Sequence, residues 1–184
     1  NGRLPNRVNS RRNAHNVYYG KYPALAGSAL DRETSLSHAR GVKSRQLMST
    51  AYRFAYPTVL SRDEDGSVIV EFPDIPEART NGRDETDALE QATDVLIVAL
   101  STYINEGRAL PSPSRPHRTQ AVVALPALAA VKLAIYQAMR DAGLSQTALA
   151  ARMKCDRKLV QRLLDLDHQS TVGQLEAALA ALGK

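Results

Sequence analysis

Between Leu144 and Leu164 the chain reads LSQTALAARMKCDRKLVQRLL, and this segment determines the architecture of the C-terminal part. Its apolar residues recur at the spacing of two short helices packed across a tight turn; they are Leu149, Ala150, Met153, Cys155, Val160 and Leu163. Ala150 supplies the small side chain needed where two helices cross. Asp156 is placed to cap the second helix by accepting a hydrogen bond from its free N–H groups. The segment therefore predicts a compact pair of helices.

The polar residues of this segment fall on the opposite side from the apolar ones. Outward-pointing cations and amides are suited to DNA phosphates and base edges, and the segment resembles the helix-turn-helix of phage-repressor type, whose second helix enters the major groove. The predicted contacts to duplex DNA are Ser145, Gln146, Asp156, Arg157, Lys158, Gln161 and Arg162. Lys154 stands at the turn position usually held by Gly, where a left-handed backbone costs a non-glycine residue about 1 kcal/mol. An amphipathic hairpin with a solvated face is the alternative interpretation.

The chain has 184 residues, which gives room for one or two small domains. Hydrophobic residues make up 43% of the sequence, which supports a core. The sequence has no run of about 18 apolar residues, so we expect no transmembrane helix and no membrane partner. It also lacks the apolar segment of a secretory signal. A single cysteine excludes an internal disulfide and fits a reducing compartment, so we expect a cytoplasmic protein.

The net charge of +5 conceals a separation of charge along the chain. Residues 1–47 carry a net +7, residues 48–116 a net −6, and residues 117–184 a net +4. An acidic middle followed by a basic C-terminal part suggests two partners of opposite charge. DNA is the natural partner of the basic part, and a basic molecule is the natural partner of the acidic one.

Residues 1–47 show neither helical nor alternating periodicity and are rich in Asn, Arg, Ser and Gly. A segment of this kind buries too little to offset its ordering entropy, so we expect disorder. In a second interpretation Met48 is the true start, and the preceding residues are a leader or a non-native extension. Their positive charge could also attract nucleic acid weakly. We favour the absence of a specific function.

The pattern from Tyr52 onward predicts a small sheet. A strand with one better-buried face is predicted where Tyr52, Phe54, Tyr56, Thr58 and Leu60 alternate with Arg53, Ala55, Pro57 and Val59. Pro57 is suited to an edge or an end. The sequence from Arg62 to Gly66 is typical of a hairpin turn, since Asp-Gly tolerates positive φ. Residues 67–72 then form the return strand, and residues 77–80 a short third strand.

A long amphipathic helix is predicted next, capped by Asp84 and ending near Asn105. The prolines of residues 111–116 first suggest a domain linker, but residues 120–125 are a strand candidate that could return to the sheet. Four helices follow, the first from Pro126 to about Asp141 with Leu128, Val131, Ile135 and Met139 inward. Thr171 and Gln174 form a capping-box pattern before the last helix, to which we assign Val172, Leu175, Leu179 and Leu182. The fold class is α+β: a ββ(β)αβ domain over residues 48–125 and an all-α domain over residues 126–184.

The segment Phe72-Pro73-Asp74-Ile75-Pro76-Glu77-Ala78, followed by Gly82 and the Asp/Glu/Ala-rich helix from Asp84, resembles the HicB antitoxins of bacterial type II toxin–antitoxin systems. The proline-rich stretch, the strand and the helix-turn-helix follow in the same order. The resemblance implies a partial ribonuclease H-like N-terminal domain that binds HicA, a small basic mRNA-cleaving toxin. It also implies a C-terminal domain that forms a homodimer or higher oligomer and binds the operator of its own operon. The expected toxin contacts are Phe72, Asp74, Ile75, Glu77 and the exposed side of the 84–105 helix.

Two other functions remain open from the residues alone. A ribonuclease H-like nuclease would need clustered acids to hold two metals; the acids available are Asp63, Glu64, Asp65, Glu71, Asp74 and Asp94. The turn position of the first three and the strand position of Glu71 favour solvation, so we expect neither an enzyme nor a metal site. A repressor whose N-terminal half senses a small molecule is the other alternative, although no polar pocket signature supports it. We expect no cofactor, because no phosphate loop or metal-ligand spacing is present.

Overall fold

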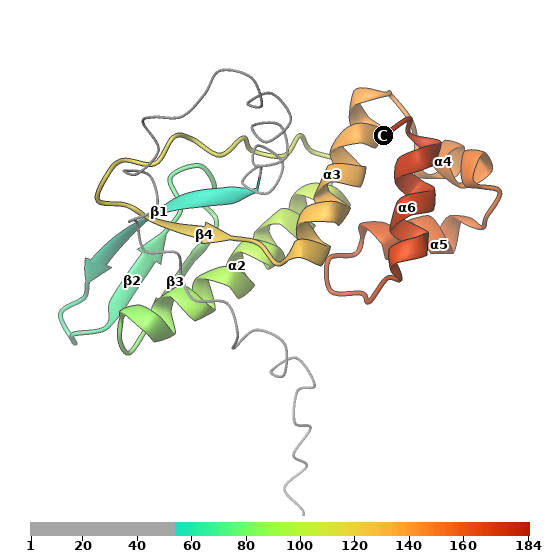
Figure 1. Ribbon diagram of the computed structural model, residues 1–184. Coiled ribbons are helices and arrows are strands. Elements are labelled where there is room, and N and C mark those ends of the chain that lie inside the picture. The colour runs from blue at the N-terminus through green and yellow to red at the C-terminus, as the bar shows by residue number, and fades with distance from the viewer. Residues whose placement is uncertain (1–53) are drawn as a thin grey trace, which may run out of the picture.

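The computed structural model describes residues 54–184, so the expectations for residues 1–47 and for the start of the first strand lie outside the described residues. Figure 1 shows a small sheet at one side and a group of helices at the other. The elements in chain order are β1 (Ala55–Arg62), β2 (Val68–Glu71), β3 (Arg79–Gly82), α2 (Glu85–Asn105), β4 (Ala121–Ala124), α3 (Ala127–Asp141), α4 (Gln146–Met153), α5 (Arg157–Leu164) and α6 (Val172–Ala181). The fold is therefore α+β, as the sequence predicts.

The four strands form one antiparallel sheet in the order β3-β2-β1-β4. The C-terminal half of β1 pairs with β2, with Val59 opposite Glu71, and its N-terminal half pairs with β4, with Ala55 opposite Ala124. The expected return of the chain to the same sheet after the proline-rich stretch is confirmed. The third strand differs from the prediction of residues 77–80, since β3 runs from Arg79 to Gly82.

The turn between β1 and β2 has the chemistry that the sequence indicates. The Asp63 N–H donates to the Ser67 carbonyl at 2.9 Å, and the Asp65 carboxylate accepts from the Ser67 N–H at 2.9 Å. Gly66 has a φ of +86°, a left-handed conformation that glycine adopts without steric cost. This turn sets the register of the hairpin.

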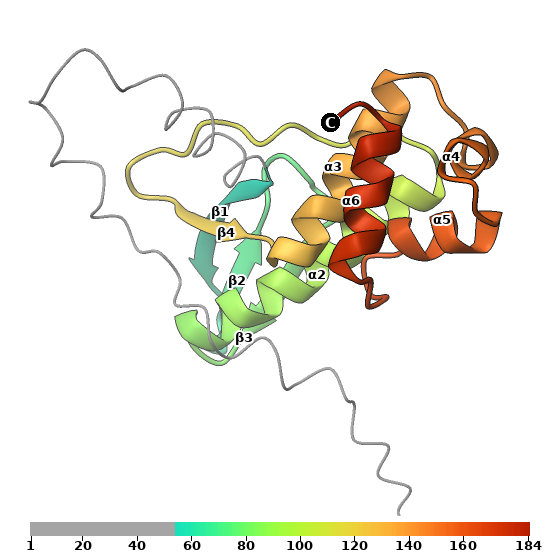
Figure 2. The same ribbon diagram turned by 45° about the vertical axis from the view of Figure 1, so that its right-hand side comes forward.

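Helix α2 packs along one face of the sheet (Figure 2). It begins where expected, because the Asp84 carboxylate accepts from the Asp87 N–H at 2.9 Å, and it ends at Asn105. Gly82 brings its start against the end of β3: a Cβ at this position would lie 2.3 Å from the Ala88 nitrogen. Only glycine permits this approach of strand and helix.

The proline-rich connection from Glu106 to Gln120 runs alongside the sheet (yellow in Figure 1) and is fastened to it. The Tyr56 hydroxyl donates to the Pro111 carbonyl at 2.9 Å, and the Ser114 N–H donates to the Asp74 carboxylate at 2.8 Å. Burial raises the pKa of the Tyr56 hydroxyl, so the donor stays protonated. The connection is thus held at two points and is not a free linker.

The last three helices begin at side-chain caps that the sequence predicts in part. Asp156 accepts from the Leu159 N–H at 2.7 Å, and Thr171 and Gln174 form the expected capping box. Val172 at the start of α6 is 70% exposed, so only the later apolar residues of this helix face inward.

The inward face of α3 differs from the expected one. Ile135 and Met139 are buried as predicted, but Leu128 and Val131 are only half-buried. Lys132 is 0% exposed and occupies the place of an apolar residue. The periodicity therefore predicted the helix and the burial of Ile135 and Met139, and Leu128 and Val131 pack at the edge of the core, but it did not mark Lys132 as buried.

The buried side chains of the sheet, α2 and the four C-terminal helices form one connected cluster. Helix α3 continues it from the sheet toward α5 and α6, as both views show. Within residues 54–184, no helix has the length and apolar character needed to cross a membrane.

Candidate functional site

Helices α4 and α5 are joined by a turn of three residues, Lys154, Cys155 and Asp156. Lys154 has a φ of 53° and a ψ of 42°, the left-handed conformation expected at this position. The Cys155 N–H donates to the Ala150 carbonyl at 3.0 Å and closes the end of α4. Ala150 is buried in the helix pair, where the small side chain was predicted.

Helix α5 presents a polar face to solvent. Arg157, Lys158, Gln161 and Arg162 are all exposed, whereas Val160, Leu163 and Leu164 are buried on the other side. The prediction that the polar residues point outward is confirmed. Exposed Arg152 and Lys154 precede this face in the chain and add two cations that the prediction did not include.

The N-terminal end of α4 carries two more of the predicted contacts, and the remaining one, Asp156, is the exposed cap of α5. The Ser145 hydroxyl accepts from the Ala148 N–H at 3.1 Å, so this side chain is engaged as the helix cap. Gln146 is half-buried, and its Oε1 atom has no hydrogen-bond partner within residues 54–184.

The C-terminal end of α5 rests on a buried lysine from α3. The Lys132 ammonium donates to the carbonyl oxygens of Arg162 at 3.1 Å, Asp165 at 2.5 Å and His168 at 2.5 Å. Burial lowers the pKa of Lys132, while Asp165 and Asp167 act in the opposite direction. Sequence reasoning did not single out this residue, although its position between Ala129 and Tyr136 on one helical stripe is a signal for burial.

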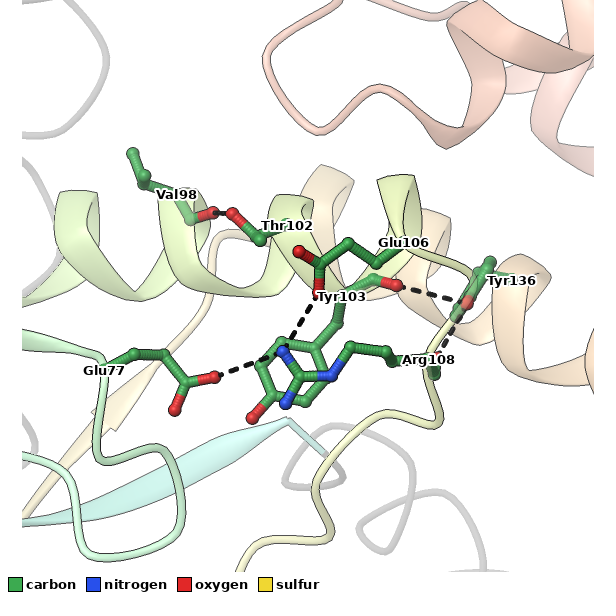
Figure 3. A network of polar contacts seen from close by, with 7 residues as sticks. All are labelled: Glu77, Val98, Thr102, Tyr103, Glu106, Arg108 and Tyr136. Atoms are coloured by element: carbon green, nitrogen blue, oxygen red, sulfur yellow. Dashed lines mark hydrogen bonds and ion pairs between the residues drawn. The ribbon is translucent and has the colours of Figure 1, made fainter.

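A polar network joins the end of α2 to α3 (Figure 3). The Arg108 guanidinium lies 3.1 Å from Glu106, 3.7 Å from Glu77 and 3.9 Å above the Tyr103 ring. The Tyr136 hydroxyl donates to the Arg108 carbonyl at 2.7 Å. A hydrogen bond from Tyr103, aided by the Arg108 charge, lowers the pKa of Glu77. Glu77 is therefore ionised at neutral pH and lies beside this junction.

Two of the expected toxin contacts are core residues in the structure. Phe72 is 1% exposed and Ile75 is 0% exposed, because the Pro-Asp-Ile-Pro segment turns their side chains inward. Neither offers surface to a partner, and we remove both from the candidate site. Asp74 is half-buried and accepts from Ser114, whereas Glu77 is exposed.

The outer face of α2 is acidic and carries one exposed apolar residue. Glu85, Glu90 and Asp94 are exposed, and Val98 is 62% exposed. Residues 90, 94 and 98 are four apart, so they lie along one side of the helix. This face corresponds to the exposed side of the 84–105 helix, which the sequence analysis predicts as a partner-binding surface.

The acids considered for a nuclease do not form a metal centre. Within residues 54–184, no group of three or more His, Cys, Asp or Glu side chains is placed to hold a metal ion. Asp63, Glu64 and Asp65 lie in the exposed hairpin turn, as expected. Glu71 is exposed on the sheet and lies 3.4 Å from the Arg79 guanidinium.

The chain matches known antitoxins. Residues 55–134 match the family model described as HicB_like antitoxin of bacterial toxin-antitoxin system. An Antitoxin HicB 1 of Photorhabdus laumondii is 35% identical over 145 residues, which cover 79% of this chain and 91% of that protein. An Antitoxin HicB of Pseudomonas fluorescens is 35% identical, covering 66% of this chain and 84% of that protein. Antitoxin HicB of Escherichia coli (strain K12) is 31% identical, covering 70% and 94%. The chain belongs to the HicB family of antitoxins.

Proposed function

We propose that this protein is a cytoplasmic antitoxin that neutralises a HicA-type mRNA-cleaving toxin and represses its own operon by binding operator DNA. The proposal is supported by the presence of two oppositely charged helix faces in one chain of this family. The outer face of α2 is acidic, and the outer face of α5 is cationic. Each has the charge that its proposed partner requires.

The α4–α5 pair is the proposed helix-turn-helix. Helix α5 enters the major groove, where Arg157 and Gln161 reach base edges and Lys158 and Arg162 add contacts to phosphates. Ser145, Gln146 and Asp156 lie at helix N-termini, where backbone N–H groups approach phosphates. A homodimer would read a pseudo-palindrome with half-sites spaced by whole helical turns.

The sheet and α2 form the proposed toxin-binding domain, a shortened ribonuclease H-like unit. An RNA-cleaving toxin that is itself basic is steered toward the acidic face of α2, which raises the association rate more than the final affinity. Val98 supplies an apolar centre on that face. Glu77, which lies 3.7 Å from Arg108 just after α2, and the half-buried Asp74 add negative charge from the segment between β2 and β3.

The toxin-binding half is tested by coexpression with the short basic protein that we expect beside this gene. The intact chain should copurify with that protein and restore growth. Glu90→Lys should slow association and weaken rescue, because it reverses a charge on the acidic face. Glu176→Lys, at an exposed position of α6, is the matched control and should rescue fully. Equal behaviour of the two variants contradicts the assignment of the α2 face.

The DNA-binding half is tested by gel shift with the duplex immediately upstream of the gene. Arg157→Ala should weaken binding by about 1–3 kcal/mol and relax the preference at one base position, if Arg157 reads a guanine. Equal weakening on a scrambled duplex would reassign Arg157 to a phosphate contact. A footprint covering a single half-site would contradict the dimeric arrangement.

A further inference from the structure

We propose that Lys132 is a positioning residue for DNA recognition: it fixes the C-terminal end of α5 against α3 and thereby sets how α5 enters the groove. This inference rests on the proposed DNA-binding function. It concerns a residue that is 0% exposed and that touches no DNA itself.

The geometry uses every donor of the ammonium group. A lysine ammonium has three N–H donors and no acceptor. Lys132 directs them at three carbonyl oxygens, those of Arg162, Asp165 and His168, at 3.1, 2.5 and 2.5 Å. These acceptors belong to the last turn of α5, to its C-terminal cap and to the loop that leads to α6. The group is therefore satisfied only when all three segments converge on α3.

The Arg162 carbonyl lies in the last turn of α5 and the Asp165 carbonyl at its C-terminal cap, where the latter also accepts from the His168 N–H at 3.2 Å. The last carbonyls of an α-helix have no intrahelical partner, and they form the negative end of the helix dipole. A cation placed there stabilises the helix end, because it donates hydrogen bonds to the last carbonyls and complements their negative charge. A buried ammonium without these partners would be strongly unfavourable. A displacement of α5 along or around its axis would break these three hydrogen bonds, so Lys132 holds the helix in one position.

Arg162 links the buried Lys132 to the proposed DNA contacts. Its backbone carbonyl accepts from Lys132, while its side chain is exposed on the proposed DNA-facing side. Gln161, the preceding residue, is one of the two proposed base contacts. Fixing this turn of α5 therefore fixes the direction in which two DNA-facing side chains leave the helix.

The test compares Lys132→Met, which keeps the length of the side chain and removes all donors, with Leu133→Ala. Leu133 is the neighbouring residue of α3, also 0% exposed, and its truncation weakens the core without touching the three carbonyls. Each full-length variant is titrated with the upstream duplex and with a scrambled duplex of equal composition, at one salt concentration. Thermal unfolding followed by circular dichroism is used to choose an assay temperature at which the wild-type chain and the variants are folded. Hydrogen exchange is followed in α2 and over residues 161–168.

We expect Lys132→Met to lower the ratio of upstream to scrambled affinity about tenfold, equivalent to the loss of one base contact. Leu133→Ala should leave that ratio unchanged. Exchange should accelerate over residues 161–168 and remain unchanged in α2. Lys132→Gln, which keeps two donors, should recover part of the ratio and replaces Lys132→Met if the latter does not fold.

A folded Lys132→Met chain with the wild-type ratio overturns the proposal. So does an unfolded Lys132→Gln chain, because Lys132 would then be a requirement of the whole core. If the wild-type chain itself does not distinguish the two duplexes, the DNA-binding proposal fails. Hydrogen exchange then decides the role of Lys132: faster exchange confined to residues 161–168 supports it as the residue that fixes α5, and uniform acceleration overturns that role.

Discussion

Lys154 is the one non-glycine residue with positive φ within residues 54–184, and it stands at the turn between α4 and α5. Its place could be predicted because the turn between two such helices needs a left-handed residue. The conformation is unfavourable for a side chain with a Cβ, by about 1 kcal/mol or more. The chain retains a lysine there, and the exposed cation lies beside the proposed DNA-facing helix.

Lys154→Gly should therefore raise the free energy of unfolding by about 0.5–1 kcal/mol, since glycine adopts this backbone without strain but loses more entropy on folding. The measurement is urea unfolding followed by circular dichroism. Lys158→Gly is the control: it places glycine inside α5 and should lower stability by about 1 kcal/mol. A loss of stability in Lys154→Gly would contradict this explanation of the turn.

At the scale of elements, the contact between β3 and α2 depends on a single missing side chain. A Cβ at Gly82 would lie 2.3 Å from the Ala88 nitrogen and 2.5 Å from its Cα, both backbone atoms of α2. Backbone cannot move away as a flexible side chain can. Helix and strand would have to separate, which would open the core between them.

We expect Gly82→Ala to lower the melting temperature sharply or to prevent folding, because the helix can no longer lie against the strand. The change is read by thermal circular dichroism. Gly173→Ala, in α6, is the matched control, since a Cβ there meets nothing within 4 Å and alanine favours a helix by up to about 1 kcal/mol. Similar melting temperatures for the two variants would show that α2 can shift at little cost.

The elements that could be predicted from the sequence are those with local signals. Asp84, Asp156 and the Thr171–Gln174 pair bond to groups three residues away, so their spacing identifies them. The start of β3 could not be placed, because its register follows from pairing with β2, with Asn81 opposite Ile69. The sequence pattern of Phe72 and Ile75 fits partner contacts as well as core residues, because apolar residues near turns can be buried either by the core or by an interface. Sequence alone does not distinguish these two kinds of burial.

The residues that connect α3 to the elements on either side of it could not be predicted from local sequence spacing. Tyr136 donates to a carbonyl 28 residues earlier, and Lys132 donates to carbonyls 30 to 36 residues later. Backbone acceptors leave no trace in residue type, so no pattern marks the partner. Only the burial of α3 between its neighbours brings these groups together.

At the scale of the whole molecule, α3 holds the sheet–α2 unit and the last three helices in one connected core. The Tyr136 hydroxyl is bonded to the Arg108 carbonyl, and the Arg140 guanidinium donates to the Gly107 carbonyl. Both contacts fasten α3 to the segment that follows α2. Unfolding should accordingly proceed as one cooperative transition.

Tyr136→Phe should lower the free energy of unfolding by about 1 kcal/mol, because the Arg108 carbonyl loses its donor. The urea midpoint should fall with an unchanged m-value, measured by circular dichroism. Tyr56→Phe removes the corresponding hydroxyl bond to Pro111 and serves as a comparison of equal chemistry on the sheet. In hydrogen exchange, only Tyr136→Phe should loosen α3. Two separate unfolding transitions in the wild-type chain would contradict the shared core.

Two of the hydrogen bonds that fix α3 overlap along the chain, and this constrains how the genes of related proteins can be joined into one chimaera. Residue 108 is joined to residue 136, and residue 132 is joined to residue 162. A single crossover between two parental genes anywhere from residue 109 to residue 161 therefore places at least one donor opposite a backbone inherited from the other parent. Every parent supplies a backbone carbonyl at these positions, so such a chimaera keeps both bonds only where the two parents place α3 and its acceptors in the same relative position.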